Sequence, residues 1–129
     1  MDQDLYDKGL AIRKDVLGED YVRRAVEGAD DFNRPFQDFL VEYCWGACWS
    51  RDGLDRKQRS LLNVGMLAAL GRTQELELHF RGALRNGLSR EELRDALIQV
   101  AVYCGVPAGV EAFRVARKVL AQEPGGGDD

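Results

Sequence analysis

The fold of this chain is decided by residues 54–87, which read LDRKQRSLLNVGMLAALGRTQELELHFRGALRNG. Apolar residues recur in this stretch at the three- and four-residue spacing of amphipathic helices. Gly71 separates two such segments, and Asn86-Gly87 follows the second one as a helix stop. The stretch therefore predicts a central pair of helices folded back on each other.

The first helix of this pair is expected to begin after Asp55, which is a strong N-cap residue, and Gln58 completes a pattern like a capping box. Between residues 61 and 70 only Asn63 is polar. A helix that is apolar on every face is typically buried, so we expect this helix to be buried on all sides. Thr73 is expected to cap the second helix.

Helical spacing also dominates the rest of the chain, and we expect further helices over residues 3–16, 19–28, 34–50, 90–104 and 107–122. Ser89 and Glu92 form a capping box for the helix over 90–104, and Gly105 ends it. Residues that favour strands are scarce, because threonine occurs once and isoleucine twice. We predict an all-α, single compact domain of about seven helices over residues 1–123, followed by a flexible tail over 124–129. The helix over 34–50 is predicted to bury an apolar stripe: Phe36, Phe39, Leu40, Tyr43, Cys44, Ala47 and Cys48.

The charge and the distribution of apolar residues argue against several classes of protein. The 129 residues carry a net charge of −4, mixed in sign, which argues against a nucleic-acid binder with a basic surface. The amino terminus has neither a basic start nor an apolar segment, so it does not resemble a signal peptide. No apolar run approaches the ~20 residues that span a bilayer. We therefore expect a cytoplasmic protein without nucleic-acid or membrane partners.

The three cysteines, Cys44, Cys48 and Cys104, do not suggest a disulfide-bonded secreted module. Cys44 and Cys48 lie one helical turn apart, where Cβ atoms are ~5–6 Å from each other, whereas a disulfide needs ~3.5–4.5 Å. Two thiols and one histidine also fall short of the four ligands of a structural zinc site. We expect buried, inert cysteines and no metal centre.

His79 is the only histidine of the chain and shares a helix face with Leu76 and Ala83. Such a residue is either a core imidazole bonded to a neighbour or a general acid whose pKa is held near neutrality by partial burial. Arg59 opens the first helix of the central pair, as an ordinary surface arginine or as a group suited to bidentate capture of a carboxylate. Arg81 lies roughly 200° around the helix from His79, so it reaches a site with His79 only across a subunit interface.

Several local strings together resemble the carboxymuconolactone decarboxylase family over about residues 5–121. They are NRPFQ (33–37), WGACWSR (45–51), GLD (53–55), RSLLN (59–63), LHFRGA (78–83) with NG (86–87), and VYCGVPA (102–108). The resemblance implies an all-helical homo-oligomer, a ring-shaped hexamer. It implies decarboxylation of 4-carboxymuconolactone to the β-ketoadipate enol-lactone in protocatechuate degradation, without a cofactor.

The resemblance also implies an active site around the central helix pair. In it His79 is the proton donor or electrostatic catalyst, and Arg59 and Arg81 hold the carboxylates of the substrate. Trp45, Trp49 and Tyr103 are expected to wall a pocket that excludes water, and Asn63 and Cys48 are further candidates for substrate binding. Asn63 and Asn86 are the weaker candidates, and Asn86 equally serves as a helix cap.

Three alternatives remain open from the sequence. Some decarboxylases of this family carry an acidic residue in the Trp-Gly-x-x-Trp string, where this chain has Ala47 and Cys48, so a related lactone or keto acid is an alternative substrate. Relatives with Cys-x-x-Cys are alkylhydroperoxide reductases, and a thiol-dependent reductase is therefore the second alternative. The third is a binding protein that keeps the pocket and has lost the reaction.

Overall fold

The computed structural model describes residues 1–123, and every regular element in this range is a helix. The predicted all-α class is confirmed. The tail predicted over 124–129 lies outside the described residues. None of the described helices is long and apolar enough to cross a membrane. The elements are α1 (Gln3–Leu17), α2 (Glu19–Glu27), α3 (Arg34–Phe39), the π-helix η1 (Leu40–Cys48), α4 (Arg56–Leu70), α5 (Thr73–Arg85), α6 (Arg90–Cys104) and α7 (Val106–Gln122).

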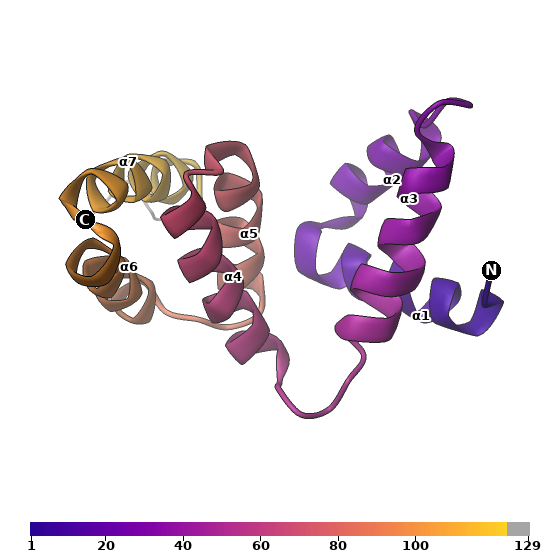
Figure 1. Ribbon diagram of the computed structural model, residues 1–129, viewed down its shortest axis with the longest axis horizontal. Helices are drawn as coiled ribbons and strands as arrows, with labels where there is room; N and C mark the ends of the chain where they lie inside the picture. Colours follow the sequence, from indigo (N-terminus) through magenta and orange to yellow (C-terminus); the bar gives the residue numbers. More distant parts are fainter. Residues whose placement is uncertain (124–129) are drawn as a thin grey trace. The chain divides into compact units, whose positions relative to one another are not determined.

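These helices form two compact units, Met1–Arg56 and Lys57–Asp129. The first unit contains α1, α2, α3 and η1, and α4 to α7 build the second (Figure 1). The predicted central helix pair corresponds to α4 and α5, which both belong to the second unit apart from the first residue of α4.

In the first unit α1 and η1 approach each other to backbone contact. A Cβ atom at Gly9 would lie 1.9 Å from the carbonyl oxygen of Val41, and one at Gly46 would lie 2.3 Å from the carbonyl oxygen of Leu5. Only glycine, which has no Cβ atom, permits such an approach. The two glycines therefore fix how these helices pack.

The segment predicted as one α-helix over 34–50 changes to a π-helix at residue 40. The backbone N–H of Trp49 donates to the carbonyl oxygen of Cys44, five residues earlier, at 3.1 Å. This wider turn places residues four or five apart on the same face, and the buried residues are Val41, Trp45, Gly46 and Trp49. The predicted apolar stripe is wrong, because the face of this segment that packs in the described chain is the one that carries Val41, Trp45 and Trp49. Its exposed members are Phe36, Phe39, Tyr43, Cys44 and Cys48.

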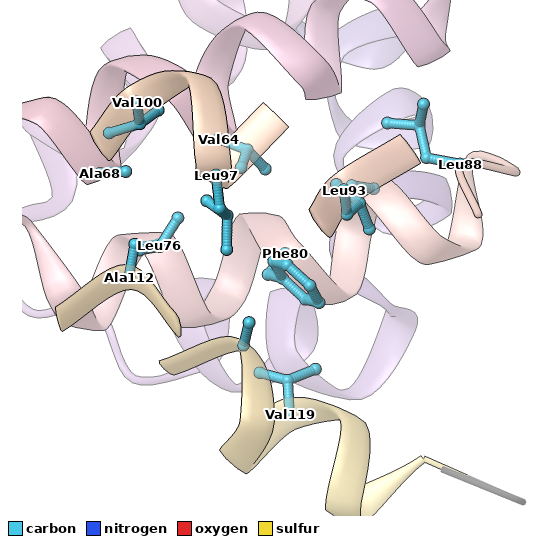
Figure 2. Close-up of a cluster of buried hydrophobic side chains, with 12 residues drawn as sticks. Val64, Ala68, Leu76, Phe80, Leu88, Leu93, Leu97, Val100, Ala112 and Val119 are labelled. Carbon is cyan, nitrogen blue, oxygen red and sulfur yellow. The ribbon is translucent and has the colours of Figure 1, made fainter. Parts of the chain in front are cut away.

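The core of the second unit is formed by side chains from all four of its helices. Phe80 and Leu76 of α5, Leu97 of α6 and Val119 of α7 belong to one cluster of buried residues (Figure 2). The predicted capping box begins α6, since the Ser89 hydroxyl accepts from the Glu92 N–H at 3.0 Å and the Ser89 N–H donates to the Glu92 carboxylate at 2.9 Å.

Two expectations for the central pair are wrong. Val64 and Ala68 of α4 are buried, but other apolar residues of the helix are not. Only one face of α4 is covered in the described chain, so a sequence that is apolar all round does not make the helix buried all round. Thr73 is the first residue of α5, and Arg72 occupies the N-cap position. The most exposed large apolar residues of α4 are Leu62 (53%), Met66 (45%) and Leu70 (69%).

Candidate active site

His79 lies half-buried on α5, with its ring toward Asn63 of α4. The Asn63 side-chain nitrogen is 3.5 Å from Nδ1 of His79, at the long limit of a hydrogen bond. With the amide nitrogen facing the ring, Nδ1 accepts in the tautomer of the neutral imidazole that carries its proton on Nε2. The structure thus pairs two predicted site residues.

The electrostatics of His79 favour this neutral ring. Burial lowers the pKa of His79, because charge is costly away from water, and the nearby Glu75 carboxylate opposes the shift only in part. At neutral pH the imidazole is therefore uncharged. A neutral ring with a protonated Nε2 is a hydrogen-bond donor at that atom.

Arg59 stands in the first turn of α4, where it is half-buried. It precedes Asn63 by four residues, so the two side chains share a helix face. A guanidinium at the amino-terminal end of a helix adds its charge to the positive end of the helix dipole. Arg59, Asn63 and His79 therefore place a cation and two polar groups along the α4–α5 pair.

Arg81 contacts residues other than Arg59, Asn63 and His79. Its guanidinium lies 3.3 Å from the Glu77 carboxylate and also donates to the side chain of Gln122 on α7. Lys118 of α7 lies 2.7 Å from the same carboxylate. The hydrogen bond from Lys118, followed by Arg81, holds the pKa of Glu77 below its usual range. As the helical period predicts, Arg81 contacts α7 while His79 contacts α4.

The aromatic residues predicted to wall the pocket have different surroundings. Trp45 and Trp49 are buried in the first unit and stack on each other, with ring centroids 4.8 Å apart and an interplanar angle of 29°. Tyr103 ends up 82% exposed near the end of α6. The role of Tyr103 in excluding water stays a prediction, since this exposed ring has no cover from the described residues of the chain.

The cysteines were expected to be buried, and this expectation is wrong, since all three are exposed. Cys44 and Cys48 lie on the solvent side of η1, because the π-helical turn directs Trp45 and Gly46 inward instead. Although the Cys44 residue as a whole is exposed, neighbouring protein atoms partly desolvate its thiol, and this desolvation raises the pKa of Cys44. Cys48 adds to the increase, and Arg13 opposes it. Among residues 1–123, no three histidine, cysteine or acidic side chains gather in a way that could hold a metal ion.

Two buried polar residues were missed in the sequence. Ser60 is fully buried in α4 and accepts a hydrogen bond from the Asn86 side chain at 2.8 Å, which ties the end of α5 to the start of α4. Arg13 is 4% exposed and donates to the Gln37 side chain at 3.0 Å. Its position four residues after Gly9, on the apolar face of α1, was the signal that could have revealed it.

Comparison with known proteins identifies the family of the chain. Residues 34–118 match the model of the carboxymuconolactone decarboxylase family. A nitrosuccinic acid decarboxylase of Metarhizium robertsii is 47% identical over 116 residues, which cover 90% of this chain and 81% of that protein. A 4-carboxymuconolactone decarboxylase of Acinetobacter baylyi is 42% identical over 119 residues, which cover 92% and 89% of the two chains. The chain therefore belongs to the carboxymuconolactone decarboxylase family.

Proposed function

We propose that this chain is a cofactor-independent decarboxylase that converts 4-carboxymuconolactone to the β-ketoadipate enol-lactone. The observation that carries the proposal is the half-buried His79, whose Nδ1 atom faces Asn63, in a chain of this family. The similarity to the Acinetobacter baylyi enzyme supports the choice of substrate. The similarity to a nitrosuccinic acid decarboxylase makes nitrosuccinic acid the second candidate.

The two candidate substrates have a skeleton in common. Each is a dicarboxylic acid with carboxyl groups on adjacent carbons, as in succinic acid. The carbon that carries one of these groups is also joined to an electron acceptor, a nitro group in one compound and an unsaturated lactone in the other. We propose that the site selects a diacid of this class.

The chemistry of such a diacid suits a neutral histidine. The bond between carbon and the departing carboxylate breaks, carbon dioxide leaves, and the electron pair spreads onto the oxygens of the acceptor group. The Nε2–H of His79 donates to such an oxygen, where charge develops, and so lowers the barrier. A proton from solvent then adds to the carbon framework. Arg59 binds the carboxylate that remains.

The first experiment measures carbon dioxide release from each candidate substrate by the wild-type protein and by His79→Ala and His79→Gln. We expect His79→Ala to lose about 10²–10³-fold in kcat, the scale of removing one donor to an oxyanion. His79→Gln retains an N–H donor and should keep part of the activity. Circular dichroism establishes that the variants are folded. Absence of release from both substrates by folded wild type refutes the proposal, and release from nitrosuccinic acid alone reassigns the substrate.

The pH profile separates the two roles of His79. A neutral donor predicts that kcat/KM is constant above the pKa of His79 and falls as the pH drops through it. The same acid limb should disappear in His79→Gln, because an amide does not titrate. A rate that instead falls as the pH rises through this pKa identifies the imidazolium as the proton donor.

The thiol-dependent alternative finds less support in the geometry. The thiolate is the reactive form of cysteine, and the raised pKa of Cys44 disfavours it. Decarboxylation predicts that Cys48→Ser keeps most of the activity, whereas a peroxidase loses its turnover of peroxide. Peroxide consumption by wild type that Cys48→Ser abolishes would restore the alternative.

We also propose that the chain works as a homo-oligomer, with the hexamer that the family resemblance implies. Exposed apolar residues on α4, among them Leu62, Met66 and Leu70, support this proposal, because large exposed apolar surfaces usually mark interaction sites. Light scattering gives the mass directly, and Leu62→Glu should reduce it. A wild-type protein that remains monomeric at micromolar concentration contradicts the assembly.

A further inference from the structure

The second unit contains a small apolar pocket away from the His79 group. It has a volume of about 160 Å³ and opens between α6 and α7. Apolar side chains of three helices form its floor and walls; they are Phe80, Leu97, Phe113, Ala116 and Leu120. Neither His79, Asn63 nor Arg59 lines it.

The size of the pocket selects a class of ligand. A cavity of about 150 Å³ lined by leucine, isoleucine and phenylalanine holds one benzene molecule. The pocket beside Phe80 and Phe113 is of that size and has the same kind of lining. Phe113, which is only partly buried, also offers the stacked or edge-on contacts that aromatic ligands prefer, and the buried Phe80 lies beneath the pocket. The apolar part of the ligand is therefore a single six-membered ring.

The rim of the pocket selects the charge of the ligand. Three arginines complete the lining: Arg90 and Arg94 from α6, one turn apart, and Arg117 from α7. Within residues 1–123, neither Arg94 nor Arg117 forms an ion pair. Guanidinium groups bind carboxylates by paired hydrogen bonds. The rim thus supplies cations that suit an anionic group attached to the ring.

We propose that this pocket binds an aromatic monocarboxylate of the size of benzoate, with its ring on Phe113 and its carboxylate between Arg94 and Arg117. The site contains no histidine or acidic side chain that could carry out the proposed decarboxylation. It is therefore a second, non-catalytic site, and its occupation stabilises the helices that line it. A wider groove of about 730 Å³ along α7 shares Phe113 and Arg117 with it and provides an approach for the ligand.

Calorimetric titration with benzoate tests the proposal, and benzamide is the matched neutral ligand of the same shape. We expect benzoate to bind at least about tenfold more tightly than benzamide, because its charge-assisted hydrogen bonds are the stronger ones. Arg94→Met and Arg117→Met should each weaken benzoate about three- to tenfold and leave benzamide unchanged. Arg24→Met, an exposed arginine of the first unit, is the control and should change neither.

The ring contact and the location of the site have tests of their own. Phe113→Ala should weaken both ligands, because it removes one wall of the ring pocket. His79→Ala should bind benzoate like the wild type, which separates this site from the proposed catalytic one. Equal affinity for benzoate and benzamide, no effect of Arg94→Met and Arg117→Met, or loss of benzoate binding in His79→Ala would each overturn the inference. Carbon dioxide release is not measured here, so failure leaves the proposed function standing.

Discussion

Gly9→Ala should destabilise the first unit more than any exposed substitution. The new Cβ atom would lie 1.9 Å from the Val41 carbonyl oxygen and 2.6 Å from the Gly46 nitrogen, whereas real Cβ contacts essentially never fall under 3.0 Å. Both contacts are with backbone, which cannot rotate away, so α1 and η1 must separate by more than an ångström. Alanine has a helix propensity about 1 kcal/mol more favourable than that of glycine. Overpacking at a site that cannot adjust costs about 3 kcal/mol. We expect a net loss of about 2 kcal/mol.

The assay can report on this unit directly. Both tryptophans of the chain, Trp45 and Trp49, lie in it and are buried, so their fluorescence follows its unfolding in urea. Gly65→Ala is the matched control, because Gly65 is inside α4 and its Cβ would meet nothing within 4 Å. This control should gain about 0.5–1 kcal/mol, seen by circular dichroism. Gly9→Ala that is as stable as wild type would refute the close approach of α1 and η1.

Three further predictions concern two substitutions and one titration. Arg13→Met should leave the free energy of unfolding unchanged or raise it by about 1–2 kcal/mol, because methionine fills the buried space without the desolvation cost of a guanidinium whose partner, Gln37, is neutral; a fall in the free energy of unfolding in urea would contradict this. The His79 ring should titrate by NMR below the ordinary histidine pKa. Its neutral form therefore favours the folded state above the unfolded-state pKa, and this stability falls as the pH drops through the window between the two values. Ser89→Ala should cost about 1 kcal/mol, measured by thermal unfolding, since it removes the capping box with Glu92.

Each of these has a control. Gln37→Leu checks whether the Arg13 result comes from the lost hydrogen bond alone. Glu75→Gln should lower the pKa of His79 further, because the Glu75 carboxylate raises it; an increase would show that this carboxylate does not stabilise the imidazolium. Ser89→Thr keeps a hydroxyl and should retain most of the stability lost in Ser89→Ala.

The helices themselves were largely predictable because their signals are local. The Ser89 capping box and the glycines with positive φ at Gly71 and Gly87 end or begin helices where the sequence places them. The shift to a π-helix at residue 40 was not predictable from the spacing, since Phe36, Phe39 and Tyr43 fit an α-helical stripe. The π-helix accompanies the close approach of η1 to α1 at Gly9 and Gly46, which is a tertiary contact.

The candidate site also combines features that were predictable from the sequence with features that were not. The helical period alone separated Arg81 from His79, because two residues turn the chain to the opposite face of α5. The contact of His79 with Asn63 and that of Ser60 with Asn86 join residues 16 and 26 positions apart. Such contacts depend on how helices pack, and no local pattern encodes them.

The sequence by itself determined the helical class, most helix ends and the family, because propensity, caps and residue order are properties of short stretches. The tertiary structure alone decided which faces are covered. It left Leu62 and Tyr103 exposed and buried Trp45 and Arg13. The physical reason is that the burial of a side chain depends on which other parts of the protein pack against it. The hydrophobicity of a residue gives only the free energy that its burial would contribute.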